Sequence, residues 1–117
     1  MRVPRQSEAD APMTRRIDVM GLDEVPEGTM KMAWVDGVEQ VLVVNLGGRL
    51  HATQGICSHE YFELDKGFIT GDTLTCALHL SRFDLLTGDP LDPPAEEPLL
   101  VYPVFIEDGR VVIEYPG

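Results

Sequence analysis

Four side chains in this sequence have the types and spacing of a metal centre. The chain has two cysteines and three histidines, and each cysteine is followed closely by a histidine. The first pair is Cys57 and His59, and the second is Cys76 and His79, with sixteen residues between the pairs. Thiolates and neutral imidazoles are ligands of zinc and of iron–sulfur clusters. The pattern C-x-H, C-x-x-H therefore predicts a metal centre held by these four residues.

The arrangement of ligands favours iron over zinc. Zinc fingers usually pair cysteine with cysteine and histidine with histidine, whereas each half of this pattern holds one of each. Mixed halves suit a [2Fe–2S] centre in which two cysteines bind one iron and two histidines bind the other. A Cys₂His₂ zinc module is kept as the less favoured alternative. The third histidine, His51, has no partner at ligand spacing and is expected to be an ordinary surface or edge residue.

The two motifs, followed by Ser81-Arg82-Phe83-Asp84, resemble those of Rieske proteins. Residues 14–115 resemble the small Rieske ferredoxins of bacterial aromatic-ring dioxygenases, of the biphenyl and carbazole type. The resemblance implies a monomeric one-electron carrier with one [2Fe–2S] cluster, and not an enzyme. It also implies transient contacts with a flavin-containing NAD(P)H reductase and a terminal oxygenase. Two alternatives stay open, the Rieske-like small subunit of a nitrite reductase and an isolated Rieske domain of an oxygenase.

The same resemblance assigns roles to residues of the two motifs. Cys57 and Cys76 are expected to bind the inner iron, and the histidines the outer one. Ser81 and Phe83 occupy positions where respiratory-type Rieske proteins carry a serine and a tyrosine, whose hydroxyls raise the reduction potential. Phe83 has no hydroxyl, and the chain lacks the two extra cysteines of that class. Both departures indicate the low-potential, dioxygenase-associated class.

The surface for partner docking is expected at the histidine tip. Glu60 and Leu80 directly follow the two ligand histidines, at positions where glycine is common in Rieske proteins. Pro93 and Pro94 lie in the stiff proline loop that follows the second motif. These four residues are the predicted docking neighbours of the cluster.

Composition limits the class of partner. The 117 residues suit a single domain, and the net charge of −11 opposes binding to nucleic acid. An acidic chain favours partners with basic surfaces. The richest apolar stretch, 99–106, is too short to span a bilayer, which needs about 20 residues. Arg15-Arg16 suggests an export signal, but acidic residues follow where an apolar region should be. We therefore expect a cytoplasmic protein that needs no membrane and has no structural disulfide.

Short apolar runs between turn signals predict an all-β domain. Strands are expected at 17–20, 30–35, 38–45, 50–53, 82–85, 100–107 and 110–115, with further short strands around Gly67 and Gly71. The continuous run 41–44 predicts a strand buried on both faces. Asp36-Gly37 and Asp108-Gly109 are hairpin signals. Residues 22–27 predict a turn or a single helical turn, and Trp34 is expected in the core.

The motifs divide the predicted strands into two groups. Residues 1–12 are interpreted as a disordered leader, and 13–117 as a Rieske-like β-sandwich or barrel. Its base comprises 14–54 and 88–117, and a small cluster-binding subdomain at about 55–87 is inserted into it. The acidic pairs Asp23-Glu24 and Glu96-Glu97 are expected to be solvated.

Overall fold

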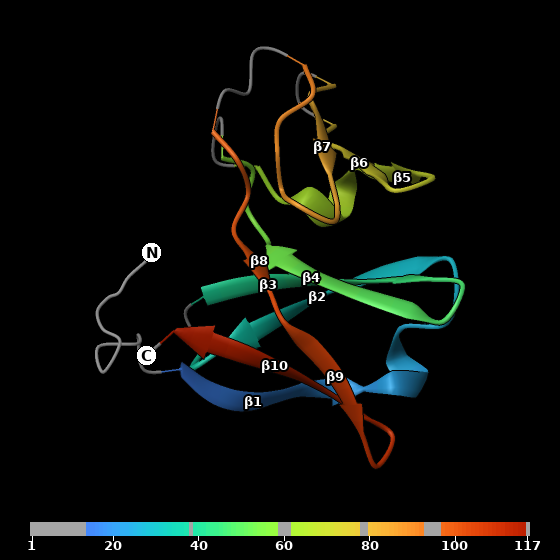
Figure 1. Cartoon of the computed structure of the whole chain (residues 1–117), viewed down its shortest axis with the longest axis vertical. Helices are drawn as coiled ribbons and strands as arrows, with labels where there is room; N and C mark the ends of the chain where they lie inside the picture. The colour runs from blue at the N-terminus through green and yellow to red at the C-terminus, as the bar shows by residue number, and fades with distance from the viewer. Residues whose placement is uncertain (1–13, 38, 59–61, 78–79, 93–96, 117) are drawn as a thin grey trace.

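The computed structural model describes residues 14–37, 39–58, 62–77, 80–92 and 97–116. The leader predicted at 1–12 lies outside these residues. Within them the chain forms three antiparallel sheets and two single 3₁₀ turns, which confirms the all-β class (Figure 1). The strands are β1 (Thr14–Gly21), β2 (Thr29–Val35), β3 (Glu39–Leu46), β4 (Arg49–Gln54), β5 (Phe68–Thr70), β6 (Thr73–Thr75), β7 (Arg82–Asp84), β8 (Val101–Tyr102), β9 (Val104–Glu107) and β10 (Arg110–Pro116). The turns are η1 (Leu22–Glu24) and η2 (Leu64–Lys66).

The sheet β2-β3-β4-β8 is the middle layer of the molecule (Figure 1). Successive side chains of a strand point to opposite faces. On β3, Val41 and Val43 pack with residues of the sheet β1-β10-β9, while Leu42 and Val44 pack with residues of the third sheet. All four are completely buried, which confirms the prediction of a strand covered on both faces.

The base of the molecule is a sandwich of β1-β10-β9 against the middle sheet. Its two adjoining clusters are made mainly of aliphatic side chains, together with one tyrosine and one methionine. Their buried members are Met20, Val25, Ala33, Val43 and Val111, and Val35, Val41, Ala52, Tyr102 and Ile113.

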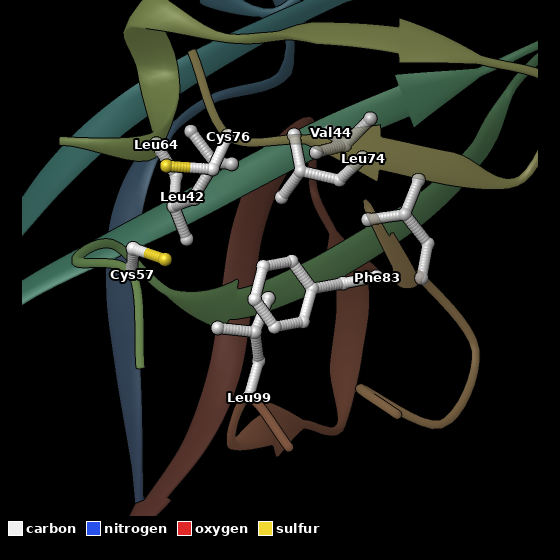
Figure 2. Packing of buried hydrophobic residues seen from close by; sticks show 9 residues of the cluster. Leu42, Val44, Cys57, Leu64, Leu74, Cys76, Phe83 and Leu99 are labelled. Carbon is white, nitrogen blue, oxygen red and sulfur yellow. The ribbon is translucent and has the colours of Figure 1, made fainter. Parts of the chain in front are cut away.

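The third sheet, β5-β6-β7, lies over the other face of the middle sheet (Figure 1). The cluster between them, here called the upper core, contains both cysteines (Figure 2). It consists of Leu42, Val44, Cys57, Leu64, Leu74, Cys76, Phe83, Leu85 and Leu99. A Cβ at Gly67 would lie 1.9 Å from the carbonyl oxygen of Thr75, so only glycine allows the chain to approach β6 this closely.

Both Asp-Gly hairpins form as the sequence predicts. Asp36 and Gly37 have φ of 56° and 73°, and Asp108 and Gly109 have 52° and 75°. Positive φ at both central residues is the type I′ geometry that matches the twist of the flanking strands. The helical turn expected after β1 is also present, as η1.

The strand expected at 100–107 is broken at Pro103. β8 pairs with β4 in the middle sheet, whereas β9 pairs with β10 in the base sheet. Proline has no N–H to donate, so a continuous ladder cannot pass through it. The chain uses this position to cross from one sheet to the other, and the Pro103 carbonyl accepts a bond from the N–H of Glu114 at 3.0 Å.

Two single-residue predictions are wrong. Trp34 is 56% exposed, because β2 is the edge strand of the middle sheet. His51 is 7% exposed, because it points from β4 into the region covered by the third sheet. The predicted solvation holds for Asp23, Glu24 and Glu97, which are exposed, while Glu96 is outside the described residues. Among the described residues, no helix has the length and hydropathy needed to cross a membrane.

Candidate iron–sulfur site

The first ligand loop begins at Cys57, after β4. The N–H of Cys57 donates to the carbonyl of Phe62 at 3.0 Å, and Ile56 and Glu63 form an isolated bridge just outside it. The hydroxyl of Ser58 donates to the carbonyl of Glu97 at 2.6 Å. The loop is therefore closed at its base and tied to the segment that returns to β8.

The second ligand loop begins at Cys76, directly after β6, and repeats the closure of the first. The N–H of Cys76 donates to the carbonyl of Ser81 at 2.8 Å, so each cysteine is bonded to a carbonyl five residues further along. The N–H of Leu80 donates to the carbonyl of Cys76 at 2.9 Å. Leu80 has φ of 62°, a left-handed conformation that favours glycine, and glycine is the residue common at this position in Rieske proteins.

The two cysteines reach the same buried region from separate loops. Cys57 is 5% exposed and Cys76 is 1% exposed, and both belong to the upper core. In Figure 2 Leu42 lies between the two cysteines, and Leu74 lies on the opposite side of the upper core. Two thiol groups held together in an apolar layer form a site for a soft metal centre that must be shielded from water.

Ser81 and Phe83 follow Cys76, at the end of the second loop and on β7. Ser81 is 1% exposed, and its hydroxyl has no hydrogen-bond partner among the described residues. Buried hydroxyls are rarely left without one. Phe83 is completely buried in the upper core together with both cysteines (Figure 2). Ser81 therefore provides a buried hydroxyl donor without a partner among the described residues, and Phe83 provides an apolar side chain in the same core as the cysteines.

These residues fit a Rieske cluster. The two buried thiols supply the soft ligands, and the unpartnered hydroxyl of Ser81 is a donor suited to a cluster sulfur. His59 and His79 would complete the ligand set, but both lie outside the described residues, as do Glu60, Pro93 and Pro94. For this reason no group of three metal-ligating side chains appears among the described residues.

The side chain of Gln54 was not anticipated from the sequence. Its amide nitrogen donates to the carbonyl of Ile56 at 2.7 Å, and its amide oxygen accepts from the N–H of Leu100 at 2.7 Å. Gln54 thus joins the strand that enters the first loop to the segment that returns from the second. Its place at the end of a predicted strand, three residues before Cys57, was the one available signal.

The family follows from comparison with known proteins. The model of the Rieske [2Fe–2S] domain matches residues 15–103. The chain is 38% identical over 98 residues to the ferredoxin component of a naphthalene 1,2-dioxygenase system of Pseudomonas aeruginosa, covering 84% of this chain and 93% of that protein. It is 37% identical over 95 residues to the biphenyl dioxygenase ferredoxin subunit of Pseudomonas sp. strain KKS102, covering 80% and 86%. This chain belongs to the Rieske [2Fe–2S] domain family, and its cofactor is one Rieske cluster.

Solved structures share the fold. The Sphingomonas yanoikuyae B1 ferredoxin is similar with a TM-score of 0.81 and 28% identity, over 87% of this chain and all of that one. A ferredoxin chain in a complex of oxygenase and ferredoxin of carbazole 1,9a-dioxygenase gives 0.77 and 28%, over 84% and 91%. A nitrite reductase small subunit from Mycobacterium tuberculosis gives 0.78 over 90% and 98%, but at 19% identity this likeness shows the fold alone.

Proposed function

We propose that this protein carries single electrons from an NAD(P)H-dependent flavin reductase to a terminal ring-hydroxylating oxygenase. The observation that carries the proposal is the pair of buried cysteines on matched loops beside the unpartnered Ser81 hydroxyl. The similarity to naphthalene and biphenyl dioxygenase ferredoxins supports the choice of partners. Those relatives are electron-transfer components and not the catalytic parts of their systems, and we assign this chain the same role.

In this role the chain holds, tunes and exposes the cluster. A Rieske cluster takes up and releases one electron, at a potential raised by its two neutral imidazole ligands. Cys57 and Cys76 anchor the inner iron in the upper core, where Leu42 and Phe83 exclude water. We assign the outer iron to His59 and His79, the histidines of the same two motifs.

The histidine tip is the proposed docking surface, with Glu60, Leu80, Pro93 and Pro94 around it. Of these, Leu80 is described, and its side chain is 62% exposed. An exposed leucine in a strained left-handed conformation contributes little to folding, which supports a role in contact with a partner. The acidic chain is expected to approach basic partner surfaces, so electron transfer should slow as salt screens the attraction.

The alternatives have less support. The nitrite reductase small subunits are alike in fold only. A zinc module conflicts with the family of the chain.

A cytoplasmic location is supported by the twin arginines, which lie inside β1 and are paired with acidic side chains. Arg15 contacts Asp36 at 2.5 Å, and Arg16 pairs with Glu107 while lying 4.4 Å from the ring centre of Phe105. Arginines paired in this way are part of the folded domain, which argues against an export signal at this position.

Reduction of the loaded protein tests this proposal. The wild type should show the EPR signal of a reduced Rieske cluster and should support turnover by the reductase and oxygenase of a naphthalene dioxygenase system. Cys57→Ser and His79→Ala should abolish the EPR signal, because each removes a bond to iron. The third histidine is the control, and His51→Gln should keep the signal. A cluster that survives the loss of Cys57 would contradict the ligand assignment.

A further inference from the structure

The outer face of the third sheet carries a feature that the cluster does not explain. Ile69, Leu74 and Phe83 point into the upper core or pack against it. By alternation, their neighbours Phe68, Thr75 and Arg82 point outward. The register places these three in one row across the sheet, because Phe68 is opposite Thr75 and Thr75 is opposite Arg82.

This row forms the floor and walls of a groove. Phe68 is 51% exposed and Leu80 is 62% exposed, whereas Thr75, which lies opposite Phe68 in the sheet, is 4% exposed. The groove has a volume of about 290 Å³ and is lined by Phe68, Thr70, Thr73, Thr75, Leu80 and Arg82. Small-molecule pockets usually exceed about 300 Å³ and enclose their ligand. An open groove of this size suits one large side chain of a partner protein.

The groove begins beside the cluster loop. Leu80 directly follows His79 in the sequence, so one wall of the groove is one residue away from a proposed iron ligand. The groove therefore continues the proposed docking tip onto the sheet β5-β6-β7. Leu80 belongs both to the groove and to the proposed tip, so a partner that contacts Leu80 at the tip would also reach the groove.

The charges in the segment that carries the groove indicate which kind of partner surface would bind there. Lys66 and Arg82 are the described basic residues between 62 and 92, and both are paired, with Glu63 at 3.0 Å and with Asp92 at 3.1 Å. Asp65, Asp72 and Asp89 are exposed and have no ion pair among the described residues. The described residues of the segment 62–92, which carries the groove, are thus net negative, and this favours an apolar side chain presented by a basic surface.

We propose that this groove, and not the histidine tip alone, receives an apolar side chain from a basic surface of the terminal oxygenase. The inference rests on the proposed function, which makes that oxygenase the electron acceptor. The similar ferredoxin of carbazole 1,9a-dioxygenase forms a direct complex with its oxygenase, which supports choosing this partner. Phe68 is then a specificity residue for docking that lies outside the ligand loops.

The test removes the apolar wall and leaves the cluster in place. Phe68→Thr puts a strand-forming polar residue beside Thr70, and Ile106→Thr is the matched control, 48% exposed on β9 of the base. The probes are the oxygenases and reductases of the naphthalene and biphenyl dioxygenase systems. Phe68→Thr should raise the KM for this ferredoxin with the oxygenase about 5- to 10-fold and keep kcat, the visible spectrum and the potential. Reduction by the reductase, and every property of Ile106→Thr, should change less than about twofold.

A second variant guards against a folding defect. Thr70→Lys places a cation at the exposed edge of the groove and should raise the same KM, because it repels a basic partner. Unchanged KM values in both variants, with an active wild type, would refute the groove and leave the electron-carrier function standing. Equal losses with reductase and oxygenase would overturn the choice of the oxygenase. A wild type that reduces neither oxygenase would contradict the proposed function, and this inference with it.

Discussion

Replacing Ser81 with alanine isolates the contribution of one hydroxyl to the reduction potential. The backbone carbonyl of Ser81 accepts the Cys76 N–H and is kept in the variant. The side chain is 1% exposed and its hydroxyl has no partner among the described residues. Ser81→Ala therefore removes a donor to the cluster without breaking a described hydrogen bond of the fold.

The expected shift follows from the strength of hydrogen bonds to charged acceptors. Such bonds contribute about 1.5–3 kcal/mol, against about 0.5–1.5 kcal/mol for neutral ones. The reduced cluster carries one more negative charge, so the hydroxyl should favour the reduced state by about 1–2 kcal/mol. For one electron, about 59 mV corresponds to 1.4 kcal/mol. Ser81→Ala should thus lower the potential by about 40–80 mV.

Voltammetry of the loaded protein measures this shift, and Ser58→Ala is the matched control. The Ser58 hydroxyl lies next to a ligand cysteine but donates to the Glu97 carbonyl, so its loss should leave the potential in place. The cluster-free form of Ser81→Ala should melt like the wild type. An unchanged potential would refute the hydrogen bond to the cluster. A strong loss of stability in the cluster-free form would show that the hydroxyl serves the fold instead.

Three further outcomes can be measured on single variants. Phe83→Tyr should raise the potential by tens of millivolts, because it adds a second donor beside the cysteines; voltammetry showing no rise would place the new hydroxyl out of reach of the cluster. Leu80→Gly should raise the free energy of unfolding by about 1 kcal/mol in denaturant titrations, because it relieves the left-handed conformation, and a loss of stability would contradict this. Burial lowers the pKa of His51 below its ordinary value of 6.5, against the raising effects of Asp72 and Asp84 and with the help of Arg49. The unfolded chain therefore takes up this proton at a higher pH than the folded chain does. The free energy of unfolding should consequently decrease as the pH is lowered from 6.5 to the pKa of His51 in the folded chain. His51→Gln should flatten that slope, and an identical slope in the variant would show that another group titrates.

The strand pattern was predictable where local signals decide it. Asp36-Gly37 forces a hairpin through its positive φ, and the run 41–44 needs two covered faces wherever it lies. The two Cys and two His could likewise be recognised by their chemistry and spacing, and their assignment as the ligand set stays a prediction because His59 and His79 lie outside the described residues. The structure then added the matched closure of the two loops by Cys57 and Cys76.

The sequence did not reveal which positions on the upper face of the middle sheet become buried in the folded chain. Trp34 and His51 both point to the upper face of the middle sheet, yet one is exposed and the other is buried. Trp34 is on β2 at the edge of the middle sheet and His51 is on the inner strand β4, and no local pattern encodes which strand becomes the edge. Gln54 was missed for a similar reason, because its partner Leu100 becomes a neighbour only in the folded chain.

The third layer also depends on the cluster ligands for its own stability. Its strands have three residues each, and a sheet this small needs packing on one face to persist. That packing is the upper core, in which Cys57 and Cys76 lie among leucines from both layers. A cluster bonded to both sulfurs would cross-link the two ligand loops. Cluster binding is therefore also folding free energy for this layer, while the base sandwich, with its own core, does not need it.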